Sequence, residues 1–404
     1  MRTGERARRR LHVAGKRSLA LAGAGYRLTM KIAFVSTGTL ANFGSTYRVL
    51  GLARQLCQQG LDVHVLLPGL PDNRARFPDR CYHGAAIHFS ECGAWSEMRS
   101  KYEILKSIRP DVVHCIDVVK RCFLPSAAYR CRNACRLVVD IDEKLSVVYR
   151  FPKNLYAYVA ERTAFWYADD MIAASRFLET QVAAYRSTRI LYLPYASDLE
   201  FFIQNRQGWE ATRQRWPGRR IVTYFGSLYP RYDAGLVFDV AVKILRKRRD
   251  TVFLFMGTGP LLDGFRAKTA QLGLQDSVHW LGFVPDSEVP KYLTASDCLV
   301  FPIRDNRMNR ARGPSKTYHY IAAMVPIVTN PVGEVCEALG ERAWYFKDGD
   351  ANDFEEVLEQ CLDAPESEQR RPDPEMAERH SWRQRADVYL RYLQQSGSPR
   401  ALTG

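Results

Sequence analysis

Short runs of apolar and β-branched residues alternate with amphipathic segments along this chain, and the alternation starts twice. The first series opens at KIAFVS (31–36), and a helical pattern follows it at 47–60. The second opens at RRIVTYFGS (219–227), and a helical pattern follows it at 235–249. Continuous Val, Ile and Leu runs between helices are typical of parallel strands covered on both faces. The sequence therefore predicts an α/β protein with two Rossmann-like, doubly wound domains.

A less periodic stretch around 196–218 separates the two series. We place the first domain at 30–204 and the second at 205–381, with a late helix at about 382–396. Ligands of such sheets bind at the carboxyl ends of the strands, beside helix N-termini. Because two sheets are predicted, we expect the site in a central cleft between them.

The first 29 residues, 1–29, form a strongly basic head. They hold eight Lys or Arg and one acid, so about half of the net charge of +14 lies there. We interpret this head as a disordered tail or as a mispredicted start before Met30; attraction to anionic lipid headgroups is a third interpretation. The apolar run 19–24 is shorter than a signal peptide requires. No window approaches the ~18 apolar residues of a membrane-spanning helix.

The cysteine pattern favours a reduced, cytoplasmic protein. None of the ten cysteines forms a CxxC pair, and several, including Cys115 and Cys298, lie inside apolar strands. Cysteine at such positions packs as a small hydrophobe. We therefore expect no zinc site and no cofactor.

The most informative stretch is RDNRMNRARGPSK (304–316), which holds five cations against one acid and leads into a helical pattern at 315–324. A helix N-terminus with clustered cations can bind a diphosphate, because it combines free N–H groups, a positive dipole end and side-chain donors. A solvated basic loop is the alternative. The predicted anion site consists of the turn-like residues Gly313, Pro314 and Ser315, followed by Lys316.

A second loop lies after the first strand of the second domain. Gly226 and Ser227 would let the backbone approach a phosphate, and Arg231 would neutralise it; an ordinary βα turn is the alternative. The Gly-Thr-Gly turn at 257–259 lacks the third glycine of a dinucleotide motif and is a weaker signal.

In the first domain, Gly44, Ser45 and Arg48 join the first strand to its helix and predict a second anion-binding edge, with a surface loop as the alternative. The acids Asp140, Asp142 and Glu143 end a later strand, where we expect them at the cleft. There they could accept a proton or stabilise a cationic transition state, or an Asp-x-Asp could hold a divalent metal. We interpret His114, on a neighbouring strand, as a packing histidine.

At these residues the sequence resembles the retaining, glycogen-synthase-like glycosyltransferases of family 4, which have the GT-B fold. The resemblance covers roughly 30–396 and is most specific in the donor-domain stretch 253–302. It is carried by MKIAFVSTGTLANFGSTYRVLGLARQLCQQGLDVHVLLPG, ADDMIAASRFLETQ, ILYLPYASDLEFF, the run from FLFMGTG to CLVFP, GPSKTYHYIAAMVPIVTN and HSWRQRADVYLRYL. It implies two facing domains and a final helix that crosses back to the first.

The resemblance also implies residue roles. Lys316 and Arg231 would face the donor diphosphate, Gly313 to Ser315 would present backbone to it, and Gly44 would line the cleft near the transferred sugar, with Arg48 at its edge. Two positions where the family usually has glutamate carry His319 and Ala311 here. Imidazole can still bond a ribose hydroxyl. The family's first-domain histidine near the sugar has no clear equivalent in this sequence; one of the catalytic candidates, Asp142 or Glu143, falls in its neighbourhood.

These observations predict a retaining, metal-independent transfer from a nucleotide-diphosphate sugar to a saccharide or lipid-linked saccharide acceptor, in cell-surface polysaccharide or glycoconjugate biosynthesis. The expected location is cytoplasmic, with peripheral contact to an anionic membrane at its inner face. The alternatives are a non-catalytic nucleotide-sugar binder, a GT-B epimerase, and a single-domain, metal-dependent transferase using Asp140 and Asp142. No nucleic-acid recognition module is visible.

Overall fold

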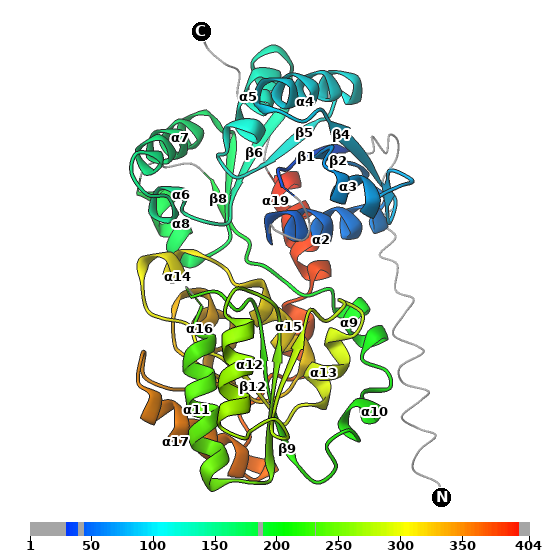
Figure 1. Ribbon diagram of the computed structural model, residues 1–404. Helices are drawn as coiled ribbons and strands as arrows, with labels where there is room; N and C mark the ends of the chain where they lie inside the picture. Colours follow the sequence, from blue (N-terminus) through cyan, green and yellow to red (C-terminus); the bar gives the residue numbers. More distant parts are fainter. Residues whose placement is uncertain (1–29, 39–43, 185–188, 231, 396–404) are drawn as a thin grey trace, which may run out of the picture.

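The computed structural model describes residues 30–38, 44–184, 189–230 and 232–395. They form two α/β domains stacked one above the other (Figure 1). The basic head 1–29 lies outside the described residues. Within the described part of the chain, no helix is both long enough and apolar enough to cross a bilayer.

The first domain holds an eight-stranded sheet with the order β3-β4-β2-β1-β5-β6-β7-β8. Among the described strands of this sheet, only β3 and β4 pair in antiparallel orientation. The strands are β1 (Lys31–Val35), β2 (Asp62–Pro68), β3 (Cys81–Tyr82), β4 (Ala85–Ser90), β5 (Val112–Ile116), β6 (Arg136–Ile141), β7 (Asp170–Ala173) and β8 (Ile190–Tyr192). The helices are α2 (Gly44–Gln58), α3 (Pro71–Arg76), α4 (Ala94–Ile108), α5 (Lys120–Arg132), α6 (Leu145–Val148), α7 (Lys153–Tyr167) and α8 (Arg176–Ala183).

The second domain holds a six-stranded parallel sheet with the order β11-β10-β9-β12-β13-β14. Its strands are β9 (Arg220–Phe225), β10 (Thr251–Met256), β11 (Val278–Gly282), β12 (Cys298–Phe301), β13 (Ile327–Thr329) and β14 (Trp344–Tyr345). Its helices are α11 (Ala234–Lys247), α12 (Leu262–Gln271), α13 (Val289–Ala295), α14 (Arg307–Ala311), α15 (Ser315–Ala323), α16 (Gly333–Leu339), α17 (Ala351–Asp363) and α18 (Pro374–Arg379), with short 3-10 turns at Gly340–Arg342 and Glu366–Glu368. The helices α9 (Leu199–Asn205) and α10 (Trp209–Arg213) lie in the connection between the domains.

Strand β1 shows why the continuous apolar runs become central strands. Ile32 and Phe34 belong to one buried cluster, whereas Ala33 and Val35 belong to another. Successive side chains of a strand point to opposite faces, so a strand that is buried on both faces needs an unbroken apolar run. The predicted parallel sheets with helices on both sides are confirmed.

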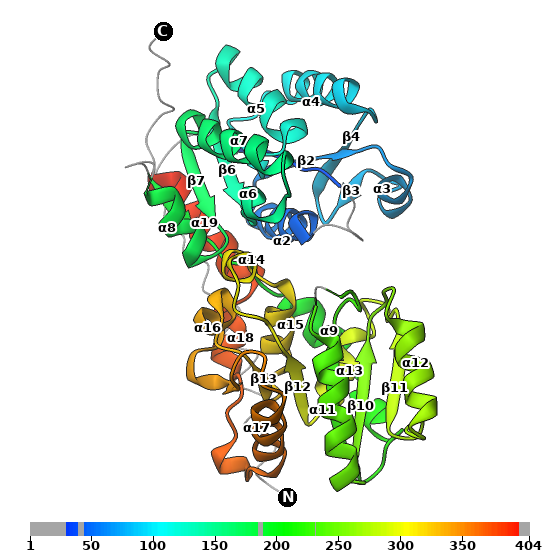
Figure 2. The same cartoon turned by 60° about the vertical axis from the view of Figure 1, so that its left-hand side comes forward.

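Strand order reverses at β1 and β5 in the first sheet and at β9 and β12 in the second. Ligands of open α/β sheets bind beside such switch points, at the carboxyl ends of the strands. Figure 2 shows α14 and α15 at the side of the second domain that faces the first. The two domains therefore offer one switch point each to the site described below.

Helix α19 (Trp382–Gln395) crosses from the second domain back to the first and lies beside α2 (Figure 1). Trp382 packs so closely on Gly51 that a Cβ on that glycine would lie 2.4 Å from the indole ring. Farther along α19, the Tyr389 hydroxyl and the His114 ring share a hydrogen bond, whose donor depends on the tautomer of the histidine. The Tyr392 hydroxyl donates a hydrogen bond to Asp170. The predicted crossing helix is confirmed, and it is anchored by packing and polar contacts.

Candidate active site

Lys316 lies in the first turn of α15, at the switch point of the second sheet. Its Nζ lies 4.4 Å from the ring centre of Phe301, 5.2 Å from that of Tyr224 and 5.9 Å from that of Tyr232. Phe301 ends β12, and Tyr224 lies near the end of the neighbouring strand β9. The aromatic faces attract the ammonium electrostatically. They hold it at the carboxyl ends of the two central strands.

The charge of Lys316 has no carboxylate partner within ion-pair distance in the described part of the chain. Partial burial and the nearby guanidinium of Arg312 lower the pKa of Lys316 to about 7, while the more distant Asp233 opposes this. Arg312 lies 5.3 Å from the centre of the same Tyr232 ring. Two cations that share one ring and repel each other favour an anion between them.

The other cations of the 304–316 stretch point elsewhere. Arg304 donates to Asp233 at 2.6 Å, and Arg310 donates to Asp305 at 2.7 Å. Arg307 lines a separate groove next to α7. The basic loop thus resolves into two neutralised arginines, one distant arginine and the Arg312–Lys316 pair. Arg231, predicted beside this pair, lies outside the described residues.

The two glycine motifs of the second domain form one structure. The N–H of Gly226 donates to Met256 O at 2.8 Å, and the N–H of Leu228 donates to Thr258 O at 2.9 Å. A Cβ on Gly257 would lie 1.9 Å from the carbonyl oxygen of Gly226, and one on Gly226 would lie 2.4 Å from Lys316 Nζ. The Gly-Thr-Gly turn therefore holds the 226–228 loop against Lys316. Ser227, in that loop, is exposed.

Gly313 is packed against the first domain. A Cβ there would lie 3.1 Å from Ala174 O and 3.2 Å from the Tyr195 ring. Close by, the hydroxyl of Ser175 donates to Ala311 O at 2.7 Å. Pro314 precedes α15 in extended conformation, and Ser315 begins the helix. The segment before α15 is therefore fixed by contacts with the other domain.

His319 lies one turn farther along α15. Its ring centre is 5.8 Å from that of Tyr47, in α2, and 6.1 Å from that of Phe225, at the end of β9. Burial lowers the pKa of His319, so the imidazole is neutral at pH 7 and can donate or accept a hydrogen bond. Rings from both domains thus flank the position where a ribose-binding residue is expected.

A second polar cluster lies at the carboxyl ends of β5 and β6. Asp142 is 3% exposed and accepts a hydrogen bond from the Tyr195 hydroxyl at 2.6 Å. Asp117, beside it, has a left-handed backbone conformation with φ of 57°. Burial, followed by the charge and hydrogen bond of Asp142 and by Glu143, raises the pKa of Asp117 well above its usual range. Asp117 therefore retains its proton at a pH where isolated carboxyl groups are ionised.

Gly44 belongs to this second cluster. A Cβ on Gly44 would lie 3.3 Å from the Tyr195 hydroxyl that bonds Asp142. Ser45 is partly exposed next to it, and Glu143 is exposed. The structure thus brings together three of the predicted first-domain residues: Gly44, Asp142 and Glu143.

Arg48 differs from the expectation of a cleft-edge cation, because its side chain is completely buried. It binds Asp140 through two nitrogens, at 2.7 and 3.1 Å, and donates to Leu193 O at 2.6 Å. His114 bonds the same carboxylate at 3.2 Å, which confirms its interpretation as a packing histidine. Arg48 and Asp140 therefore stabilise the domain instead of facing a ligand.

Asp140 is consequently committed to Arg48 and does not form a metal pair with Asp142. The described residues include no group of three His, Cys, Asp or Glu side chains that could hold a metal ion. All ten cysteines have free thiols.

Two residues of the clusters were missed at the sequence level. Tyr195 falls in a run that reads as a plain apolar strand, and its link to Asp142 joins positions 53 residues apart. The sequence already places Asp117, together with His114, at the end of a strand, and this position is the signal from which a role for it could have been predicted.

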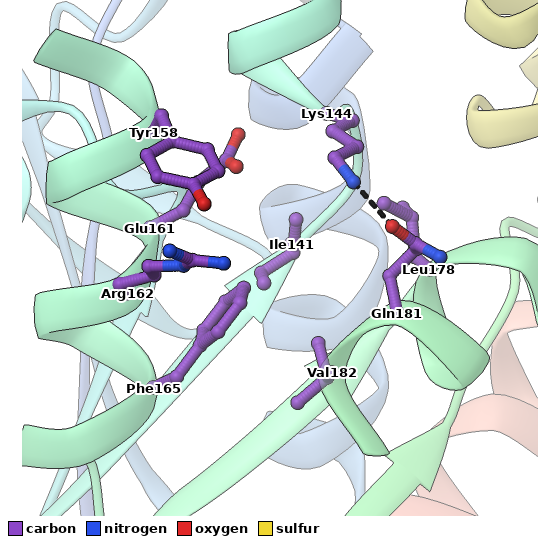
Figure 3. A pocket seen from close by; sticks show the side chains of 9 residues that line it. All are labelled: Ile141, Lys144, Tyr158, Glu161, Arg162, Phe165, Leu178, Gln181 and Val182. Atoms are coloured by element: carbon purple, nitrogen blue, oxygen red, sulfur yellow. Dashed lines mark hydrogen bonds between the residues drawn. The ribbon is translucent and has the colours of Figure 1, made fainter. Parts of the chain in front are cut away.

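Figure 3 shows a small apolar cavity between α7, α8 and the end of β6. Lys144 donates a hydrogen bond to Gln181 across its rim. Its lining residues include none of the Lys316 cluster and neither Asp117 nor Asp142. This cavity is therefore separate from the candidate active site.

Both halves of the chain match known domain families. Residues 43–196 match the glycosyl transferase 4-like domain, and residues 219–364 match glycosyl transferases group 1. The 2-deoxystreptamine glucosyltransferase of Streptomyces kanamyceticus is 32% identical over 23% of this chain and 23% of its own length. The alpha-D-kanosaminyltransferase of the same organism is 24% identical over 54% of this chain and 61% of its own. The matched stretches thus span less than two thirds of these relatives.

Similarity in structure extends over nearly the whole chain. The crystal structure of Anabaena Alr3699/HepE in complex with UDP and glucose superimposes with a TM-score of 0.72 at 14% identity, covering 91% of this chain and 100% of that one. The fold is GT-B, with two Rossmann-like domains.

Proposed function

We propose that this chain, built from two glycosyltransferase domains in a GT-B arrangement, is a retaining glycosyltransferase. It would move a sugar from a nucleotide-diphosphate donor to a saccharide or lipid-linked saccharide acceptor. The observation that carries the proposal is Lys316. It is a half-buried ammonium at the N-terminus of α15, with an aromatic floor, a second cation beside it and no carboxylate partner among the described residues.

The donor diphosphate would lie between Lys316, Arg312 and the 226–228 loop, with Arg231 expected on the same side. When the bond between the anomeric carbon and the phosphate oxygen breaks, negative charge develops on the leaving diphosphate. Fixed cations and the N–H groups of a helix N-terminus stabilise that charge without reorganisation. No metal ion is needed for this role, and we propose a metal-independent reaction. His319 would bond a ribose hydroxyl of the donor.

The acceptor would approach from the first domain, near Gly44. Its hydroxyl forms the new bond to the anomeric carbon on the face from which the diphosphate leaves. The hydroxyl proton passes to the leaving phosphate oxygen or to a carboxylate, Asp142 or Glu143. A carboxylate at Asp142 would also stabilise positive charge on the sugar in the transition state, and its burial would strengthen that attraction.

Similarity to transferases that act on saccharide-containing substrates supports a role in polysaccharide or glycoconjugate biosynthesis. One such relative is described as a putative teichuronic acid biosynthesis glycosyltransferase of Bacillus subtilis, 25% identical over 43% of this chain. We propose a cytoplasmic location, with the acceptor presented at the inner face of the membrane.

A panel of nucleotide-diphosphate sugars, tested by thermal shift on the purified chain, examines the proposal directly. One or more donors should raise the melting temperature, and Lys316→Ala should weaken binding of that donor by about tenfold to a hundredfold, the loss expected for a charge-assisted contact. Lys243→Ala, on the outer helix α11, is the matched control. Equal donor binding by Lys316→Ala and the parent chain would contradict the proposed site.

Product analysis separates the remaining alternatives. Transfer or slow donor hydrolysis with retained anomeric configuration supports the proposal. Binding without any turnover would indicate a non-catalytic relative, and conversion of the donor to an epimer without acceptor would indicate an epimerase. Loss of activity in chelator would contradict the metal-independent mechanism.

A further inference from the structure

The outward face of α7 is apolar. Leu155, Val159 and Trp166 are 60, 56 and 79% exposed and lie along one side of the helix, because they are spaced four and seven residues apart. Phe151, just before the helix, is 82% exposed. The inward face already packs into the domain through Ala157, Glu161, Ala164 and Phe165. A helix with apolar residues on both sides is typical of an element covered by a partner.

The apolar face extends over the whole 148–166 segment. Eight of the fourteen exposed large hydrophobic residues in the described part of the chain lie there: Val148, Tyr149, Phe151, Leu155, Tyr156, Tyr158, Val159 and Trp166. The other six are scattered over both domains. Exposed apolar side chains that are concentrated in one segment, and not scattered singly, indicate an interaction surface.

The exposed charged side chains within the 144–166 segment are all cationic. Lys144, Arg150 and Lys153 form no ion pair within the described residues, although Lys144 donates a hydrogen bond to the neutral Gln181. The acid of the segment, Glu161, is buried and accepts hydrogen bonds from the N–H and hydroxyl of Ser146 at 2.9 and 2.8 Å. A partner of this surface should therefore be apolar at its centre and negatively charged around it.

A groove of about 500 Å³ opens beside the apolar face. Its walls combine the cations Lys144 and Arg307 with the apolar side chains of Phe151, Leu155 and Tyr158. Figure 1 places α6 and α7 at the outer side of the first domain, with α14, which begins at Arg307, below them. Cations and apolar side chains in one groove suit the phosphate and the upper acyl chain of a lipid.

We propose that the 144–166 segment docks this protein on an anionic phospholipid bilayer. Tyr and Trp rings prefer the interfacial region, Phe, Leu and Val reach the acyl boundary, and Lys and Arg contact lipid phosphates. The mixture of aromatic residues and unpaired cations fits this surface better than the apolar surface of a second copy, which would bring like charges together.

Docking through this segment has a consequence for the proposed reaction. The chain runs directly from Asp142 and Glu143 into Lys144, so the acceptor-side carboxylates would lie next to the bilayer. A lipid-linked acceptor could reach them without leaving the membrane. Only this consequence for the acceptor rests on the proposed function; the docking itself does not. The two can be tested separately, because vesicle binding is measured without donor and donor binding is measured without vesicles.

Co-sedimentation of the full chain with vesicles tests the proposal. Binding should be strong on phosphatidylcholine mixed with phosphatidylglycerol and weak on phosphatidylcholine alone. Leu155→Gln/Trp166→Gln and, separately, Arg150→Gln/Lys153→Gln should each lower the partition coefficient on the mixed vesicles by about tenfold or more. The controls are Trp95→Gln and Phe283→Gln, which remove side chains 81 and 75% exposed elsewhere. They should bind as the parent does.

Circular dichroism and donor binding without vesicles show that each variant is folded. Undiminished vesicle binding by both double variants would overturn the proposal. It would indicate that another region, such as the basic head 1–29, contacts the membrane. Concentration-dependent dimerisation in sedimentation velocity without lipid, abolished by Leu155→Gln/Trp166→Gln, would overturn it in favour of a second copy. Failure of donor binding with intact vesicle binding would contradict the proposed function but not the docking surface.

Discussion

Arg48 and Asp140 form a two-pronged ion pair in which neither side chain reaches solvent, with nitrogen-to-oxygen distances of 2.7 and 3.1 Å. The pair joins α2 to β6. Through His114 and then Tyr389, it also connects to the crossing helix α19. The first domain therefore has a buried polar chain that links four elements distant in sequence: α2, β6, β5 and α19.

Arg48→Ala should destabilise the protein by about 3–5 kcal/mol, because it leaves the Asp140 carboxylate buried without its cation. Denaturant unfolding measures the change. Arg383→Ala is the control, since Arg383 pairs with Glu378 at the surface, where such a pair contributes about 0–1 kcal/mol. Similar decreases in the free energy of unfolding for the two variants would show that the buried pair contributes no more to stability than the surface pair.

Donor binding should depend on pH through Lys316. Burial and Arg312 hold the pKa of Lys316 at about 7 in the free protein, and a bound diphosphate would raise it. Below pH 7 the lysine is already protonated, so the affinity should be level. Above pH 7 binding must also take up a proton, and the affinity should fall by up to about tenfold per pH unit until the pKa of the bound state.

Calorimetric titration with a nucleotide-diphosphate sugar from pH 6 to pH 9 measures this dependence. Lys316→Arg is the matched variant, because a guanidinium stays charged throughout this range. It should flatten the profile above pH 7. A level profile in the parent chain would mean that Lys316 is not close to the diphosphate.

Gly257→Ala should damage the donor loop. The added Cβ would lie 1.9 Å from the carbonyl oxygen of Gly226, and the backbone φ of 146° is unfavourable for alanine. We expect a loss of stability of about 1–3 kcal/mol and weaker donor binding. Gly264→Ala, inside α12 with no atom within 4 Å of the new Cβ, should instead stabilise the protein by about 0.5–1 kcal/mol. Thermal unfolding and donor titration distinguish the two.

The fold could be predicted from the sequence because its evidence is local. The unbroken apolar runs that became β1 and β9 record burial on both faces, and the restart of the pattern marks the second domain. The anion site could be predicted to the level of Lys316, since the cations and the helix start are adjacent in sequence. The sequence could not predict which cations remain unpaired, because the partner of Arg304, Asp233, lies 71 positions away along the chain.

The first-domain cluster was harder to predict for the same reason. Arg48 and Asp142 both follow strands and both suit a cleft. Only the packing decides that Arg48 turns inward to Asp140, 92 residues away, whereas Asp142 meets Tyr195. Pairings over such separations depend on sheet order, which no local pattern records. The Gly-Thr-Gly turn was similarly underestimated, because its role is visible only against Gly226.

Asp117→Asn should stabilise the protein at neutral pH. The pKa of Asp117 is raised in the folded state, so ionising this carboxyl costs more there than in the unfolded chain. Below the unfolded pKa, near pH 4, both states hold the proton and the carboxyl causes no loss of stability. As the pH rises above 4, the unfolded state releases its proton first, and the stability of the parent chain declines until the folded pKa is reached.

Asparagine removes this decline and can still donate a hydrogen bond to Asp142. The variant should therefore gain about 1 kcal/mol at pH 8 and nothing at pH 4. Thermal unfolding at the two pH values measures the difference. Asp263→Asn, whose carboxylate is exposed on α12, should change neither. A gain of equal size at both pH values would mean that the effect of Asp117→Asn comes from packing or relief of its φ of 57°, and not from the raised pKa of Asp117.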